Sequence, residues 1–217
     1  VLTESYLDTG NRRSFAQSGN VVTLGGRAKT WAEDGNAPLD VRREFVEPLF
    51  HQFDARASKV CSETVSEDAP LTDGADLHLV TDTDTGMVIR KTREANDRVM
   101  FMIPANVKSV RIVSRTSRPS DVIGPFVDDR RNLGVLIGDI TLFEESRTHR
   151  ITAHLKTETL EGWSNPEKGN MRWTAGRGLL PLGSRPSNSI AILALQIKAC
   201  GPYKLAPQNN AGLSLTA

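Results

Sequence analysis

The chain has 217 residues, 38% of them hydrophobic, which is enough for one main domain with a sizeable core. Its 27 lysines and arginines nearly balance its 26 aspartates and glutamates, so the net charge of +1 argues against a dedicated nucleic-acid-binding protein. No apolar stretch approaches the roughly 18 to 20 residues that cross a bilayer, and residues 1–20 lack the pattern of a signal peptide. We therefore expect neither a nucleic-acid partner nor a membrane span.

Residues 1–60 are predicted to form a loop-rich segment followed by one helix. Runs rich in Asp, Gly and Asn surround the short apolar piece from Val21 to Leu24, so at most one short strand is expected there. Over residues 38–58 apolar side chains recur every three or four positions, which predicts an amphipathic helix. Pro48 removes a backbone donor from the middle of this helix and predicts a kink or a break near Glu47.

Residues 61–203 are predicted to form a β-sandwich domain. After residue 70 the apolar period falls towards two, in short β-branched runs bounded by Asp, Gly, Pro and Asn. The predicted strands are Leu77–Val80, Met87–Ile89, Val99–Ile103, Val107–Val113, Leu133–Phe143, Arg150–Leu155, Met171–Thr174, Leu179–Leu182 and Ile190–Ala199. Because no convincing crossover helix separates them, we expect a mainly β fold, an antiparallel two-sheet sandwich of the jelly-roll kind. Residues 204–217 carry little to bury and are predicted to be a flexible tail.

No motif with a well-defined catalytic mechanism occurs, among them GxSxG, HExxH and the P-loop. His149 and His154 are five residues apart, so on one strand they would point to opposite faces and could not share a metal ion. His78 lies inside an apolar run and is predicted to be structural. Asp82 and Asp84 suit either a calcium loop or a hairpin turn, and the turn is favoured. We expect no cofactor and no metal, and the chain leans towards a protein that is not an enzyme.

The segment EGWSNPEKGNMRWT, residues 161–174, holds the first group of candidate ligand-binding residues. Trp163 or Trp173 could offer a flat face to a sugar ring, with Glu167 and Arg172 bonding its hydroxyls. The alternative, which is favoured, places one or both tryptophans in the core of the sandwich.

The cluster DDRR at residues 128–131 holds the second group, Asp129 and Arg130. An ion pair between one of its acids and one of its arginines would fix a loop onto the sheet, and a ligand contact is the weaker alternative. Asp129 paired with Glu167 or Asp139 would be the carboxylate pair of a glycan hydrolase, which is the least favoured reading. Cys61 and Cys200 are consistent with two free thiols or with one disulfide.

Two patches resemble bacterial proteins that contain a Hint (hedgehog/intein) autoprocessing domain. ESYLDTGNRRSF, residues 4–15, resembles the segment just after that domain, and the anchors SR at 114–115, DDRRNLGV at 128–135 and RWT at 172–174 resemble their C-terminal region. The nucleophile that self-cleavage requires does not precede Glu4, so the resemblance implies the part downstream of the autoprocessing core. It also implies a bacterial, secreted or cell-surface protein, although the chain begins at Val1 rather than Met and its localisation stays open.

The preferred hypothesis is a non-catalytic β-sandwich module that binds a carbohydrate or a cell-surface partner. The second is a structural or self-assembling subunit, a homo-oligomer in which the tail after Tyr203 could dock on a neighbour. The third is the glycan hydrolase.

Overall fold

The computed structural model describes residues 14–18, 21–25, 40–60, 69–83, 86–145, 147–186 and 188–205. The chain forms two compact units, Val1–Thr64 and Val65–Ala217. The division falls close to the predicted boundary after residue 60.

The first unit contains a hairpin that the sequence did not predict. Strand β1 (Ser14–Ser18) pairs antiparallel with β2 (Val21–Gly25), and only two residues connect them. We expected a single strand at Val21–Leu24, because the polar sequence of β1 lacks the apolar alternation that marks a strand.

Helix α2 (Arg43–Val60) is the amphipathic helix, and it begins later than predicted. The carboxylate of Asp40 accepts the backbone N–H of Arg42 at 3.0 Å and binds its guanidinium, which lowers the pKa of Asp40 to about 2. The helix continues past Pro48, so the predicted break at Glu47 is wrong, since one missing N–H removes only one helical bond. None of its residues is buried, and Phe53 remains 46% exposed.

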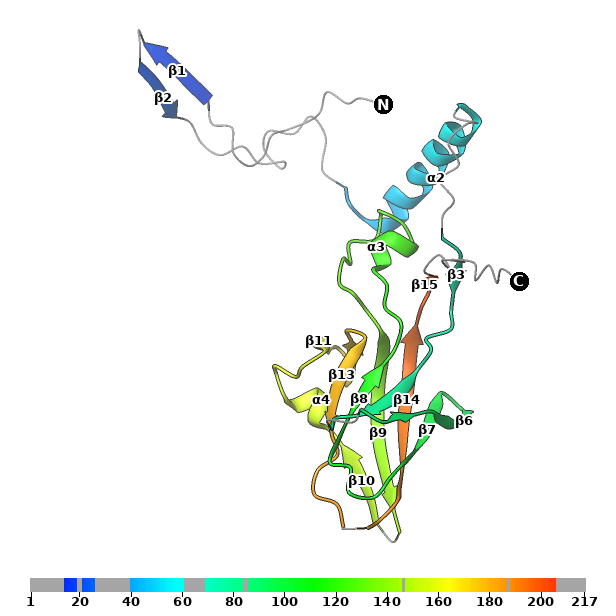
Figure 1. Cartoon of the computed structure of the whole chain (residues 1–217). Coiled ribbons are helices and arrows are strands. Elements are labelled where there is room, and N and C mark those ends of the chain that lie inside the picture. The colour runs from blue at the N-terminus through cyan, green and yellow to red at the C-terminus, as the bar shows by residue number, and fades with distance from the viewer. Residues whose placement is uncertain are drawn as a thin grey trace, which may run out of the picture. The chain divides into compact units, whose positions relative to one another are not determined.

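The second unit is built on two antiparallel sheets and a short ladder (Figure 1). The larger sheet has the order β11 (Trp163–Glu167), β12 (Met171–Thr174), β9 (Val135–Glu144), β14 (Ala191–Cys200), β7 (Arg98–Ile103) and β6 (Lys91–Ala95). Strand β10 (Arg147–Ile151) pairs with the second half of β9. The smaller sheet has the order β13 (Arg177–Pro181), β8 (Ser109–Val113), β4 (His78–Thr81) and β5 (Val88–Ile89). The ladder joins β3 (Leu71–Thr72) to β15 (Tyr203–Lys204).

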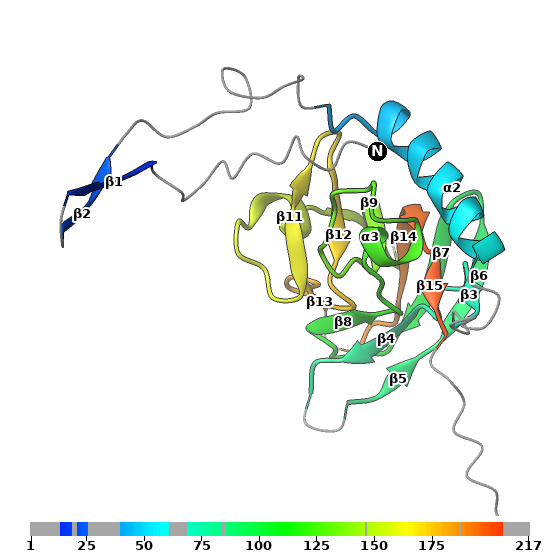
Figure 2. The same ribbon diagram turned by 90° about the horizontal axis from the view of Figure 1, so that it is seen from above.

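The two sheets face each other as the layers of a sandwich, as seen from above in Figure 2. The pairs β7–β14, β8–β13 and β9–β12 are nested in sequence and alternate between the sheets, as in a jelly roll. The predicted mainly β, antiparallel two-sheet fold is confirmed.

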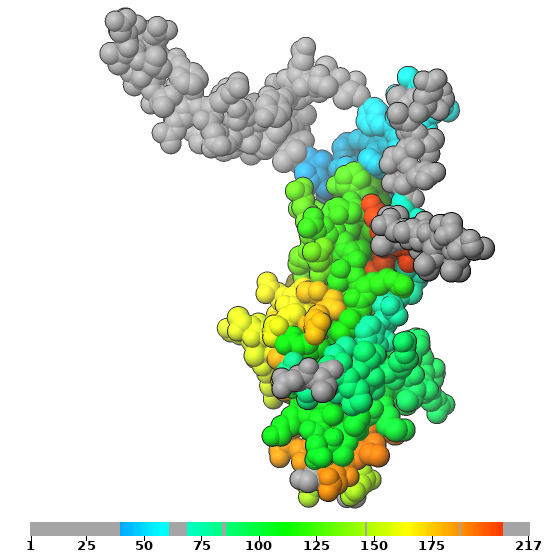
Figure 3. All heavy atoms as spheres, viewed as in Figure 1, coloured from blue at the N-terminus to red at the C-terminus, as the bar shows by residue number. Residues whose placement is uncertain are grey.

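Alternation along the strands builds the core. In β7, Val99, Phe101 and Ile103 point inwards and are at most 4% exposed, whereas Met102 points outwards and is 53% exposed. The strand predicted over Arg150–Leu155 is wrong in its second half, where the short helix α4 (Ala153–Lys156) replaces it. A second short helix, α3 (Pro119–Val122), lies at one end of the sandwich. The opposite end is formed by the segment before β14 and the turn after β9 (Figure 3).

Candidate functional site

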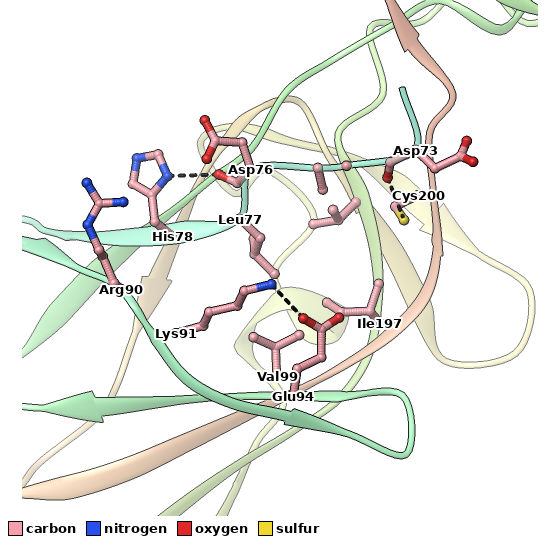
Figure 4. Close-up of a pocket in the computed structure, with 13 residues that line it drawn as sticks. Asp73, Asp76, Leu77, His78, Arg90, Lys91, Glu94, Val99, Ile197 and Cys200 are labelled. Atoms are coloured by element: carbon pink, nitrogen blue, oxygen red, sulfur yellow. Dashed lines mark hydrogen bonds and ion pairs between the residues drawn. The ribbon is translucent and has the colours of Figure 1, made fainter. Parts of the chain in front are cut away.

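A cleft of about 420 Å³ opens beside the larger sheet, between the segment that leads into β4, strand β6 and the second half of β14 (Figure 4). Its floor is aliphatic and comes from the core residues Leu77, Val99, Val135 and Ile197. Its rim is polar and includes Asp73, Asp76, His78, Arg90, Lys91 and Glu94. Small-molecule sites have this size and this combination of an apolar surface with a few polar groups.

Hydrogen bonds from one arginine stabilise the loop before β4. The guanidinium of Arg115 donates to the carbonyl of Gly74 at 2.6 Å, and its backbone N–H donates to the carbonyl of Ala75 at 2.8 Å. Asp76 adopts a left-handed conformation with φ of 50°, which acidic residues tolerate better than most. Its carbonyl then accepts the Nδ1 proton of His78 at 2.9 Å, so the imidazole Nε2 remains free to accept.

Strand β6 supplies the opposite rim. Lys91 Nζ lies 2.6 Å from Glu94 Oε2, and both side chains are more than half exposed, so this pair contributes little to stability. The side chain of Arg90 makes no hydrogen bond and no ion pair within the described residues.

Cys200 lies at the edge of the cleft with an exposed thiol, and its sulfur donates to the carbonyl of Asp73 at 3.7 Å. Partial burial, together with the carboxylates of Asp73 and Glu94, raises the pKa of this thiol. A thiol that holds its proton is a poor nucleophile. Cys200 is a free cysteine in this structure, and Cys61 lies outside the described residues.

Trp163 belongs to the core rather than to a ligand site. It is 8% exposed, its indole N–H donates to the carbonyl of Leu179 at 2.7 Å, and its ring packs 5.3 Å from that of His154. The Cα of Gly178 also lies against the indole, where a side chain would collide with it. Trp163 therefore has no open face for a sugar.

Arg172 is also structural. It is 1% exposed, and its guanidinium donates to the backbone carbonyls of His154, Thr157, Glu158 and Ser164. Burial lowers the pKa of this guanidinium, and four of its five N–H donors are used by these carbonyls, so the side chain is not available to a ligand.

The remaining predicted residues lie on the outer surface. Arg131 binds Asp129 at 2.7 Å and Glu167 at 2.9 Å, so the expected pairing in the DDRR cluster exists and fixes the loop to β11. Trp173 is half-buried and lines a small apolar pocket of about 220 Å³ beside α3. Arg130 is 84% exposed and lies only loosely near Asp128, at 3.9 Å.

Of the carboxylates proposed for hydrolysis, Asp129 and Glu167 are both bound by Arg131. The hydrogen bonds from Arg131 lower the pKa of Asp129, whereas a general acid requires a raised pKa. Asp139 is paired with Arg150.

The histidines and the possible calcium loop form no metal site in the described residues. The sequence analysis placed His149 and His154 on one strand. In the structure His154 lies on α4 and is fully buried, so the two do not share a strand. Asp82 is paired with Arg111 at 2.9 Å, and Asp84 lies outside the description. Among the described His, Cys, Asp and Glu side chains no group of three could hold a metal ion.

No protein-family model, curated protein or solved structure matches the chain. In the described part of the chain, no helix has the length and apolar character needed to cross a membrane. Sequence reasoning missed the cleft because its rim comes from residues 73–78, from β6 and from β14, which only the folded sheets bring together. The sequence feature that could have indicated the cleft is the polar run TDGAD, residues 72–76, which lies just before His78.

Proposed function

We propose that this protein is a non-catalytic β-sandwich module that binds carbohydrate, and that the cleft of Figure 4 is its binding site. The observation that carries the proposal is the cleft itself, in which planar polar groups surround an aliphatic floor. Carboxylates accept and a guanidinium donates two hydrogen bonds at once, which suits neighbouring hydroxyls, and the floor suits the C–H face of a sugar ring. The resemblance to the region that follows Hint domains supports a bacterial cell-surface setting.

An acceptor of the rim provides the test. The substitution Asp73→Asn keeps the shape of the side chain and removes its charge. It should weaken binding to any bacterial exopolysaccharide fragment identified on a glycan array by roughly tenfold in calorimetry, because hydrogen bonds to charged groups are the strong ones. Thermal stability should not change, since this side chain is exposed.

Asp97→Asn is the matched control, because Asp97 lies in the turn between β6 and β7 and does not line the cleft, and Asn also adopts its φ of 61°. Unchanged binding by Asp73→Asn, or an array without a single bound glycan, would contradict the proposal.

Self-assembly is a second candidate, and a specific surface favours it. Met102, Ile192 and Phe143 are register neighbours on β7, β14 and β9, and they form an outward row of which each member is 42 to 53% exposed. Contiguous apolar surface of this kind marks interaction sites. We expect concentration-dependent dimers in light scattering that Ile192→Lys abolishes. A wild-type monomer at high concentration would remove this candidate.

A further inference from the structure

The charged residues of the cleft are distributed along its length. In Figure 4, Arg90, His78 and Asp76 lie at one end, Asp73 lies beside Cys200 at the other, and the Lys91–Glu94 pair lies between them. The paired lysine and glutamate cancel each other. Among the described residues that line the cleft, Arg90 is therefore the one cation that lies at the end away from Asp73.

Arg90 is the unmatched cation of this site. Arg111 and Arg131, by contrast, each bind two acids: Arg111 binds Asp82 and Glu161, and Arg131 binds Asp129 and Glu167. The guanidinium of Arg90 has no such partner among the described residues, although it lines the cleft. A free guanidinium presents a planar fork of donors that matches a carboxylate.

Two acids oppose an anionic ligand, and the structure offsets both in part. Asp73 is at the far end from Arg90 in Figure 4. Asp76 is at the near end, and the cation of Arg115 is bonded to the carbonyl of Gly74 between the two acids. With Lys91 and Glu94 neutralising each other, Arg90 is left to attract the anion.

We infer that the ligand is an acidic sugar, a uronic acid unit whose carboxylate binds Arg90. The sugar hydroxyls then donate to the Nε2 of His78, which is free because Nδ1 donates to Asp76, and to the carboxylate of Asp73. The ring lies on Leu77, Val99 and Ile197. This inference rests on the proposed function and narrows it to one class of sugar.

The test is calorimetric titration of the whole chain with alginate and polygalacturonate oligosaccharides, and with the same oligosaccharides after their carboxyl groups have been reduced to alcohols. We expect the acidic forms to bind more tightly and to lose affinity as salt is added. Arg90→Gln should weaken binding of the acidic form at least about tenfold. Asp76→Asn should strengthen it about twofold to threefold, because a repulsive charge is removed while the backbone that holds His78 is kept.

Arg93→Gln is the matched control, since Arg93 is an exposed arginine of β6 outside the cleft, and it should bind as the wild type does. Equal affinity for acidic and reduced forms, or an acidic form that binds Arg90→Gln undiminished, would overturn the acidic-sugar inference and leave the carbohydrate-binding proposal in place. Binding of neither form would overturn both.

Discussion

The protonation of His154 is coupled to folding. Its side chain is fully buried on α4, and Nε2 donates to the carbonyl of Gly138 at 2.8 Å. Burial is the main cause that lowers the pKa of His154, and the cation of Arg172 acts in the same direction. The folded protein therefore holds the neutral ring.

This predicts a pH-dependent stability. Because the folded pKa lies below the unfolded value of about 6.5, the unfolded chain takes up the proton first as pH falls. Stability should be fully present well above pH 6.5 and should decline as pH falls through that value towards the lower pKa of the folded state. Urea unfolding at several pH values would measure the slope, and His154→Phe should flatten it. A variant slope equal to that of the wild type would contradict the assignment.

Single residues are also where prediction from sequence fails. Trp163 is the register partner of Thr174, whose side chain is buried, and Trp173 precedes Thr174 on the same strand. Because successive side chains of a strand point to opposite faces, Trp163 faces the core while Trp173 faces outwards, although both were candidates for one platform. The Asp129–Arg131 pair could be anticipated, because it is local in sequence, whereas Arg90 could not be distinguished from other surface arginines.

At the scale of elements, Arg172 stabilises a whole segment. Its guanidinium donates hydrogen bonds to carbonyls of α4, of the following turn and of β11, and so holds residues 154–164 against β12. One buried guanidinium thus links four carbonyls of this segment to β12.

We expect Arg172→Met to destabilise the domain by roughly 3 kcal/mol or more, since four carbonyls, among them that of the buried His154, lose their donor at once. Arg177→Met, on the exposed start of β13, is the control and should change stability by less than about 0.5 kcal/mol. Chemical denaturation of both variants measures the difference. Equal stabilities would show that the segment does not depend on Arg172.

The elements themselves followed from the sequence where alternation is strong. β7, β9, β12 and β14 were located to within a few residues, because one face of each is buried. β1, α4 and most of β10 were missed. For β10 the reason is that it is an edge strand with four exposed residues, which carries no apolar pattern.

For the whole domain, one ion pair closes the end opposite α3. Glu144 and Arg185 are 3 and 4% exposed and lie 2.6 Å apart, and Arg185 also donates to the carbonyls of Pro104, Val107 and Ser189. These contacts join the loop after β7, the end of β9 and the segment before β14.

Arg185→Met should lower the stability of the domain by about 3 to 5 kcal/mol, because the carboxylate of Glu144 is left buried without its cation. Glu144→Leu/Arg185→Met should recover a large part of this loss, since no buried charge remains. Thermal unfolding of the two variants tests the expectation. A double variant less stable than the single one would refute it.

The fold class followed from spacing alone, but the order of strands within each sheet did not, because nested pairing joins segments far apart in the chain. The pairing of β3 with β15 is one such long-range contact. It brings the point where the polypeptide enters the sandwich next to the point where it leaves, about 5 Å away across one ladder. A domain built in this way can be inserted into a surface loop of another protein as a cassette, with both junctions side by side and the host backbone left undistorted.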